Sequence, residues 1–569
     1  MANGMGSLMV GATGLRSSQT ALNTTAHNLS NVNTEGYTRQ QITFADSTYA
    51  NVFSKSLNKG KYGLGVDIDA ISRIRNEFID RSYRTESSRL GFYESQANAV
   101  YEVEDWFGEM QGVTYQEHIT NLYNAVNELT KNPTSTIARS SLIQNATAFI
   151  DRSEAIYSGL KDYQVTLNTE VNNMVEKINS LGQKIYNLNK GIVKVEAEGV
   201  ERANDLRDSR DLALDELSKY IDIDYYETKD GEVIVSAENV PFITKNDIAK
   251  MSVREEGTYG LLIPQWEGYQ QDVYNFDKQA NNANDTDKGK LKGLLIARGV
   301  IEVNYKDIPV MPERADYDLT TEQGMAEYNS AMDAYQQKQD YYNKYIEPSA
   351  ILSAIAGFDK LVNGIVTAMN DVLCPETTMN TTKELTDADG NILKAEKYVY
   401  NASAHDVLYD SHGNAVAGKE NGDGTYSYEA SEKLYVDANQ EETENIDSMT
   451  YKILDMSKAG YGMDDDETRG VELFKRNGTD RYKQITGADG STIYVRNNLN
   501  VTGFETDYTL GNLIVNPKAS QNVGTLPLST EHGKEDFSKV NELIDTFSKK
   551  FASLNPENYA KADFNTFYN

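Results

Sequence analysis

The chain has 569 residues and a formal net charge of −31, from 86 acidic and 55 basic side chains. An acidic surface disfavours nucleic acid and anionic membranes as partners, because phosphate groups are bound by clustered Lys and Arg. The only cysteine, Cys374, excludes an internal disulfide and metal sites built on several cysteines. No run of roughly eighteen apolar residues occurs and no secretory signal peptide opens the chain, so we expect no membrane span. The length predicts about four domains, and the 37 tyrosines suggest a hydrogen-bonding surface.

The N-terminal segment carries a leucine at every seventh position. Leu8, Leu15, Leu22 and Leu29 form one narrow apolar seam on a helix, which is the pattern that a partner helix covers. Residues 31–37 (NVNTEGY) then end the helix, because asparagine and glycine tolerate the left-handed backbone of a turn. We therefore expect one amphipathic helix, one turn and an unpaired apolar seam.

Alternation between residues 42 and 74 predicts extended segments, and helical spacing follows over 76–106, 115–130 and 135–150. The clearest period lies between Tyr163 and Glu198, where apolar residues alternate at three and four positions. This spacing predicts a long helix in a coiled-coil-like bundle. Its seam consists of Val171, Met174, Ile178, Leu181, Ile185, Leu188, Ile192 and Val195.

Residues 204–220 continue as a helix with many charges between Asp205 and Asp211. Such a run is most often a solvated helix face with weak ion pairs. An ion-pair network at a domain junction is the alternative. Alternating residues at 221–236, around Lys229-Asp230-Gly231, predict a hairpin.

Further helices are expected at 291–298, 316–345, 351–371 and 537–551. Between them, residues 375–508 hold short aromatic and β-branched runs around Asp389-Gly390, Asp423-Gly424 and Asp489-Gly490, which predict hairpins.

The predicted fold class is α+β and multidomain: a long-helix bundle core, an inserted β-rich outer module and a terminal coiled-coil-forming helix. We expect domains at 1–45 (axial helix and turn), 46–372 (helical core), 373–508 (β-rich outer domain) and 509–569 (return to the core).

The sequence contains no recognisable enzymatic motif. His405 and His412 are the only histidines with a spacing worth testing for a metal, and they lie in a loop-like context. Residues 387–391 (DADGN) do not match a calcium loop, which needs glycine at its sixth position and a glutamate at its twelfth. Cys374 ends an apolar helix and is interpreted as a packing residue. We predict no catalytic residues, no metal and no cofactor.

The N-terminal motif resembles that of the bacterial flagellar axial proteins, the family of rod, hook and hook-associated proteins. The resemblance rests on residues 14–15 (GL), 21–22 (AL) and 27–37 (HNLSNVNTEGY), and residues 38–40 (TRQ) are similar to the hook-associated branch. Residues 204–211 (NDLRDSRD), 289–295 (GKLKGLL) and 513–518 (LIVNPK) also look like that branch. Glu35 replaces the proline more usual before Gly-Tyr.

The resemblance implies a structural protein that forms a junction ring between hook and filament by axial self-assembly, outside the cell. It implies partners as well: other copies in a ring, the hook protein, a second junction protein next to the filament, the flagellar export apparatus and an export chaperone. The implied assembly residues are Leu8, Leu15, Leu22 and Leu29, with Asn28, Asn31, Asn33, Gly36 and Tyr37 shaping the turn. The alternatives are the hook or another axial protein, an adhesin-like surface protein, or an enzyme carried on the variable module.

The family ends in a second amphipathic helix that pairs with the first, and this sequence stops before such a helix. We therefore expect a truncated chain whose residues 1–45 are disordered in the isolated monomer, because uncovered leucines forfeit about 1.5–3 kcal/mol each and isolated helices are marginal in water.

Overall fold

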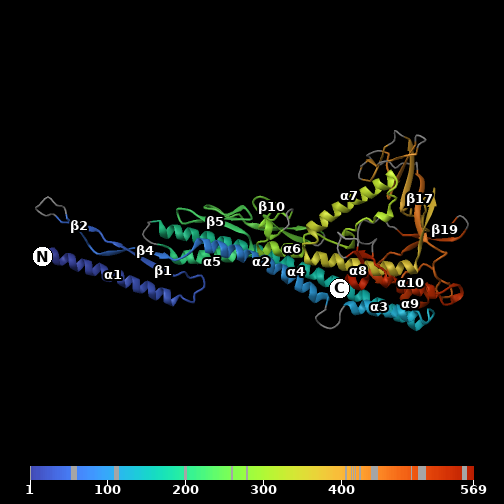
Figure 1. The fold of residues 1–569 in the computed structure, drawn as a ribbon, viewed down its shortest axis with the longest axis horizontal. Coiled ribbons are helices and arrows are strands. Elements are labelled where there is room, and N and C mark those ends of the chain that lie inside the picture. The colour runs from blue at the N-terminus through green and yellow to red at the C-terminus, as the bar shows by residue number, and fades with distance from the viewer. Residues whose placement is uncertain are drawn as a thin grey trace. The chain divides into compact units, whose positions relative to one another are not determined.

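The computed structural model describes residues 2–52, 60–107, 115–197, 202–257, 260–276, 280–403, 407–411, 413, 415–416, 418–421, 425–436, 446–487, 490–497, 508–553 and 560–568. The chain divides into two compact units (Figure 1). Unit 1 comprises Met1–Glu102, Tyr163–Glu302 and Lys344–Ile351, and unit 2 comprises Val103–Asp162, Val303–Asn343 and Leu352–Asn569. The domain boundaries given above stay a prediction.

Most helices lie where the apolar spacing predicts them, and the two short helices at Pro517–Gln521 and Phe564–Tyr568 have no counterpart in the sequence prediction. The helices are α1 (Ala2–Ser30), α2 (Glu77–Phe107), α3 (Tyr115–Leu129), α4 (Thr136–Glu196), α5 (Asn204–Tyr220), α6 (Lys290–Arg298), α7 (Glu322–Tyr345), α8 (Ala350–Leu373), α9 (Pro517–Gln521), α10 (Phe537–Ser548) and α11 (Phe564–Tyr568). The predicted helices at 135–150 and 163–198 are one helix of 61 residues, α4. Its connecting residues remain helical because Ile156 and Leu160 are buried four positions apart. Gly159 lies inside this continuous helix. A Cβ there would be 2.4 Å from the ring of Trp106, so glycine at this position lets the ring lie against the helix.

Unit 1 contains four small antiparallel sheets. Their strands are β1 (Gln40–Asp46) with β4 (Val66–Arg73), β2 (Tyr49–Val52) with β3 (Gly60–Gly63), β5 (Ile223–Glu227) with β6 (Val233–Ala237) and β7 (Val240–Ile243), and β8 (Met251–Glu256) with β9 (Leu261–Trp266) and β10 (Gln271–Asp272). The β1–β4 register shifts between Thr43 and Phe44. β5 and β6 form the hairpin predicted around residues 229–231, with Gly231 at φ +84°.

Glycines let α2 approach its neighbours closely in unit 1. A Cβ on Gly293 of α6 would lie 2.5 Å from the carbonyl oxygen of Phe92 on α2. A Cβ on Gly91 would lie 2.5 Å from the carbonyl oxygen of Lys219 at the end of α5. Neither position has room for a larger residue, so α2, α5 and α6 form a tightly packed group.

Unit 2 is organised around α8. Its apolar residues are fully or almost fully buried: Ile351 (which unit 1 contributes), Ile355, Phe358, Leu361, Val362, Ile365, Val366 and Met369. By length and composition alone, α8 is the one helix of the described chain that could cross a membrane, yet 56% of the relevant window is buried inside the protein. The core helix of a water-soluble protein passes the same test, so the observation is weak evidence for a membrane span.

A seven-stranded antiparallel sheet lies within residues 376–496 of unit 2, where β17 and β19 are labelled in Figure 1. Its main path runs β15–β16–β12–β17–β20–β19, and β11 pairs with β17. The strands are β11 (Glu376–Thr381), β12 (Lys397–Ser403), β15 (Lys419–Glu420), β16 (Thr425–Ala430), β17 (Ile446–Leu454), β19 (Tyr482–Thr486) and β20 (Thr492–Arg496). Shorter pairs are β13 (Leu408–Tyr409) with β14 (Ala415–Val416), β18 (Phe474–Arg476) with β21 (Leu513–Val515), and β22 (Ala552–Ser553) with β23 (Lys561–Ala562).

Gly390, in the first predicted hairpin turn, has φ +85°, and residues around it form a bridge between Thr386 and Ile392. Asp423-Gly424 and Asp489 of the other two predicted turns lie outside the described residues. The strands that flank them, β15 with β16 and β19 with β20, are paired antiparallel.

The sheet has its own core, and tyrosines form much of it. Tyr398, Tyr400, Tyr428 and Tyr451 are buried together with Met449 and Val495. The hydroxyls accept backbone N–H bonds: Tyr400 from Leu434 at 2.9 Å, Tyr398 from Ala395 at 3.2 Å and Tyr451 from Leu385 at 3.3 Å. Tyrosines therefore form part of a core, in addition to the hydrogen-bonding surface that their number suggests, because a buried Tyr is stable once its hydroxyl is paired. The fold class, long helices with separate small sheets, is confirmed.

Candidate assembly interface

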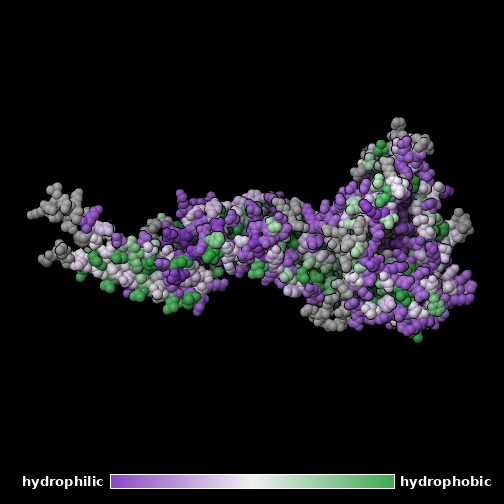
Figure 2. Space-filling view, in the orientation of Figure 1, coloured by the Kyte–Doolittle hydropathy of each residue, from purple (hydrophilic) through white to green (hydrophobic). Residues whose placement is uncertain are grey.

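The leucine seam of α1 is exposed in unit 1. Leu8, Leu15, Leu22 and Leu29 keep between 65% and 74% of their surface. Figure 2 shows hydrophobic residues along α1 at the left of the view. A soluble helix normally turns its apolar stripe toward the core. In α1 the stripe points outward, so the side that makes contacts must be the polar one.

The polar side of α1 packs on the β1–β4 hairpin. The hydroxyl of Ser17 donates to the carbonyl of Val66 at 3.3 Å, and that of Thr13 lies 3.4 Å from the carbonyl of Leu64. Between these two carbonyls, Gly65 adopts φ +114°, and a Cβ there would lie 2.0 Å from Thr13 Oγ1. Small hydroxyl side chains and a glycine thus allow the backbone of the hairpin to touch the helix.

Asn28 joins the end of α1 to the start of β1. Its amide nitrogen donates to the carbonyl of Gln40 at 2.9 Å, while its oxygen accepts the N–H of Gln40 at 2.9 Å and the hydroxyl of Tyr37 at 2.8 Å. The ring of Tyr37 also meets that of His27 edge-on, with centroids 5.5 Å apart. One asparagine therefore satisfies both backbone groups of a strand residue and orients the tyrosine of the turn.

The other predicted turn residues lie in the same loop. The side chain of Asn31 donates to the carbonyl of His27 at 3.0 Å, and Asn33 is exposed. Gly36 has φ +78°, and a Cβ there would lie 3.1 Å from the Cβ of Leu212 on α5. The turn thus rests on α5 at a position where glycine relieves both backbone strain and crowding.

Most of the charged run of α5 is buried, with Asp205 the exposed exception, so its interpretation as a solvated face is wrong. Asp208 and Asp211 bind Arg73 of β4 at 2.7 Å and 2.8 Å, and Arg84 of α2 binds Asp215 at 2.6 Å. Asp208 also accepts the backbone N–H of Thr38 at 3.1 Å. Burial alone would raise the pKa of Asp211, but the neighbouring Arg75 and Arg73 outweigh it and lower that pKa. The structure contains an ion-pair network here, and all of these partners lie within unit 1. The predicted position of the network at a domain junction stays a prediction.

A second cluster fixes the other side of α5. Arg207 holds both carboxylate oxygens of Glu196, at the end of α4, at 2.8 Å, and binds Glu227 of β5 at 2.7 Å. The hydrogen bonds from Arg207 lower the pKa of Glu196 to about 2. Arg210, fully buried, binds Glu227 at 2.8 Å and the carbonyl of Gly231 at 2.6 Å. Together the two clusters join helices α2, α4 and α5 to strands β4 and β5.

The predicted seam of α4 lies largely in the interior of unit 1. Val171, Met174, Ile178, Leu181, Ile185 and Ile192 are buried, Leu188 is half-buried and Val195 is exposed. At Gly182 the helix touches the ring of Phe242 on β7, and at Gly191 it approaches Leu206 of α5. Strands as well as a helix therefore cover this face.

Three asparagines on α4 each pair with the backbone of the sheets. Asn189 donates to the carbonyl of Val233 at 2.7 Å and accepts its N–H at 3.1 Å, and Asn179 does the same with Met251 at 2.9 Å and 3.0 Å. Asn168 donates to the carbonyl of Gly260 and accepts the N–H of Leu262, both at 3.1 Å. Apolar periodicity does not reveal these residues. In the sequence, these asparagines are marked only by their spacing of ten to eleven residues, which is about three helical turns.

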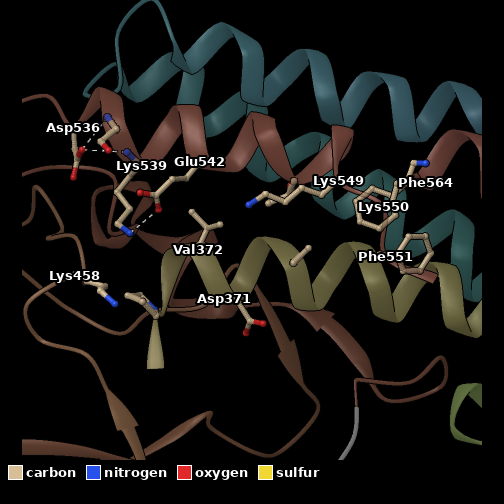
Figure 3. Close-up of a pocket in the computed structure, with 14 residues that line it drawn as sticks. Asp371, Val372, Lys458, Asp536, Lys539, Glu542, Lys549, Lys550, Phe551 and Phe564 are labelled. Carbon is tan, nitrogen blue, oxygen red and sulfur yellow. Dashed lines mark hydrogen bonds and ion pairs between the residues drawn. The ribbon is translucent and has the colours of Figure 1, made fainter. Parts of the chain in front are cut away.

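A pocket in unit 2 has a volume of about 580 Å³ and lies between α8 and α10 (Figure 3). Its polar groups hold the structure: Asp536 caps α10 by accepting the N–H groups of Ser538 and Lys539 at 3.1 Å, and Lys539 binds Glu542 at 3.0 Å. Cys374 is fully buried, and burial raises the pKa of its thiol to about 12, which makes it a poor nucleophile. Within the described residues no group of three or more His, Cys, Asp or Glu side chains could hold a metal ion, and His405 and His412 lie outside them.

Comparison with known proteins gives family matches in two regions of the chain. Residues 8–38 match the family of flagella basal body rod proteins, and residues 100–331 match the helical domain of the flagellar hook-associated protein FlgK. Flagellar hook-associated protein 1 of Bacillus subtilis is 30% identical over 310 residues, which cover 52% of this chain and 61% of the relative. The same protein of Salmonella typhimurium is 26% identical over 213 residues, 37% of each chain. The chain thus spans less than two thirds of the length of these relatives.

The solved structure of the flagellar hook junction protein FlgK from Burkholderia pseudomallei is also similar, with a TM-score of 0.40 and 12% identity over 79% of this chain and 66% of that one. The rod-family match covers α1 and its turn, the segment that carries the exposed seam and the Asn28 junction. By sequence the chain is therefore similar to the flagellar axial proteins. Within that class it is similar to flagellar hook-associated protein 1.

Proposed function

We propose that the chain is a structural subunit of the bacterial flagellum that forms the junction between hook and filament, outside the cell. The exposed leucine seam of α1 carries this proposal. Buried in an assembly, its four leucines would contribute up to roughly 6–12 kcal/mol per subunit. In the isolated chain the four leucines are exposed to solvent and this stabilisation is absent, so their burial favours the assembled state.

The geometry of unit 1 suits this role. The α1 helix meets its own chain through hydroxyl groups, a glycine and Asn28, which leaves the apolar seam free for another helix or subunit. The buried charge clusters around α5 hold the hairpin and the turn in place. The proposed function is thus positional rather than catalytic: unit 1 presents the exposed seam of α1 for assembly.

The proposed partners follow from the same role. They are other copies of the chain in a ring, the hook protein on one side, a second junction protein on the filament side, and the export apparatus with a chaperone during secretion. A chain with one buried cysteine and no internal disulfide suits export in an unfolded state.

Deletion of the gene followed by electron microscopy tests the proposal. We expect hooks without filaments and flagellin released into the medium. Complementation with Leu15→Glu/Leu22→Glu should fail, whereas Asn23→Glu, which places a charge on an exposed position beside the seam, should restore filaments. Intact filaments in the deletion strain would refute the junction role, and a strain without hooks would indicate the hook protein itself.

A further inference from the structure

The hairpin that joins β6 to β7 turns on two residues, Glu238 and Asn239. Ala237 pairs with Val240, so these two residues form the whole loop. Both have a left-handed backbone, at φ +47° for Glu238 and +64° for Asn239. Two-residue loops of this kind favour Asn-Gly or Asp-Gly, because few other residues adopt positive φ without strain. Glutamate is unusual at the first position, so we expect the contacts of its side chain to hold the turn.

Three other segments of unit 1 enclose the carboxylate of Glu238. Its side chain keeps 15% of its surface, and Oε2 lies 4.0 Å from Nζ of Lys292 on α6. The backbone N–H of Glu238 donates to the carbonyl of Asp222, the residue before β5, at 3.1 Å. Nζ of Lys292 also lies 5.9 Å from the centre of the ring of Tyr274, which follows β10. The turn therefore contacts α6 and the residue before β5, and Lys292 joins it to Tyr274.

Two buried polar atoms of this cluster lack partners. Within the part of the chain that the structure describes, neither Oε1 of Glu238 nor the hydroxyl of Tyr274 has a hydrogen-bond partner. Burial raises the pKa of Tyr274 well above its usual value, so its hydroxyl stays protonated. The ion pair of Glu238 with Lys292, at 4.0 Å, is too long for a hydrogen bond. A buried carboxylate held so weakly is costly, and the cost is removed when it binds a proton.

The charged groups that face Glu238 come from α6, from the residue that precedes β5 and from the segment before α6. Burial raises the pKa of the Glu238 carboxyl to about 7, with Lys292 and Lys288 opposing the rise and Asp222 adding to it. Lys288 is engaged elsewhere, by Asp285 at 2.8 Å and by Asp222 at 3.6 Å. The two lysines therefore compensate the buried carboxylate only in part.

We propose that Glu238 is a pH-sensitive switch that closes the β6–β7 turn when it carries a proton and loosens the turn when it loses that proton. In an opened turn the carboxyl is solvated and titrates at its ordinary value of 4.5. The closed turn thus holds more protons between about pH 4.5 and 7, and its stability is lost as the pH rises through about 7. β7 carries Phe242, whose ring touches α4 at Gly182, so the switch acts beside a contact of the long helix. This inference goes beyond the proposed function and does not depend on it.

Hydrogen exchange of the full chain, followed by mass spectrometry between about pH 5.5 and 8.5, tests the switch. Peptides that cover the turn are compared between the parent and Glu238→Gln at each pH, which cancels the chemical pH dependence of exchange. Relative to the variant, opening of the parent turn should increase about tenfold or more across this range, because only the parent closes with a proton. Glu255→Gln, at an exposed position of β8, is the matched control and should follow the parent.

Two further measurements use the same chain. Infrared difference spectroscopy should show the carbonyl band of a protonated carboxylic acid that disappears as the pH rises through about 7, and Glu238→Gln should lack that band. Lys292→Gln removes the nearest cation, so it should move the transition of the turn to higher pH. Exchange at the turn with the same pH dependence in the parent and Glu238→Gln would overturn the inference. A missing infrared band would overturn it as well, as would a transition that Lys292→Gln leaves in place.

Discussion

Replacing Asn189 by leucine tests whether the stability of unit 1 follows the apolar spacing of α4 or the contacts that α4 makes in the structure. By sequence, Asn189 is a polar residue beside an apolar heptad seam, and leucine there would extend the seam. In the structure it is buried and pairs with both the N–H and the carbonyl of Val233, and it also accepts a bond from Arg210 at 3.2 Å. We therefore expect Asn189→Leu to destabilise unit 1.

The magnitude follows from the lost bonds. Two buried backbone groups left without partners cost about 1–3 kcal/mol each. Burial of the leucine side chain offsets about 1.5–3 kcal/mol. The net loss in free energy of unfolding should be roughly 1–3 kcal/mol, with Arg210 still held by Glu227 and Gly231.

Urea denaturation measures this loss. The chain has two tryptophans, and Trp266 is buried in unit 1, so a Trp106→Phe background makes fluorescence report on that unit. Asn187→Leu, at an exposed position two residues away, is the matched control and should change stability by less than about 0.5 kcal/mol. Asn189→Leu as stable as its parent would refute the reasoning and restore the simple heptad interpretation.

Three further predictions concern unit 1. Native amide exchange of the isolated chain should show weak protection across Leu8–Leu29 compared with α4, because the leucines of α1 are uncovered; strong protection would contradict the expected disorder of residues 1–45. Asn28→Ala should weaken the α1–β1 junction by about 1–3 kcal/mol, seen as faster exchange of the Gln40 amide, with Asn23→Ala unchanged. Acid should destabilise unit 1 as the pH falls from about 4.5 to about 2, because the pKa of Glu196 is lowered in the folded state and its contribution is complete only above the unfolded value. Glu196→Gln should flatten that pH dependence, and an unchanged slope would show that other carboxylates dominate.

The sequence by itself determined the positions of the helices, the hairpins and the N-terminal motif. These features depend on local rules: apolar spacing marks a helix whatever covers it, and Gly36 marks a turn because few other residues adopt φ near +78°. The same periodicity revealed the seams of α1 and α4. It could not tell which seam the chain covers itself, because the spacing is identical for a core and for an interface.

Only the tertiary structure decided what each face contacts. The α4 seam is largely buried, whereas the leucines of α1 are exposed and the polar side of that helix carries the packing. The charged run of α5 was ambiguous for the same reason. Arg73 and Arg84 are far from it in sequence, and only folding brings them to Asp208, Asp211 and Asp215. Local spacing thus fixes which residues share a face, and long-range packing decides whether that face is core, ion-pair network or interface.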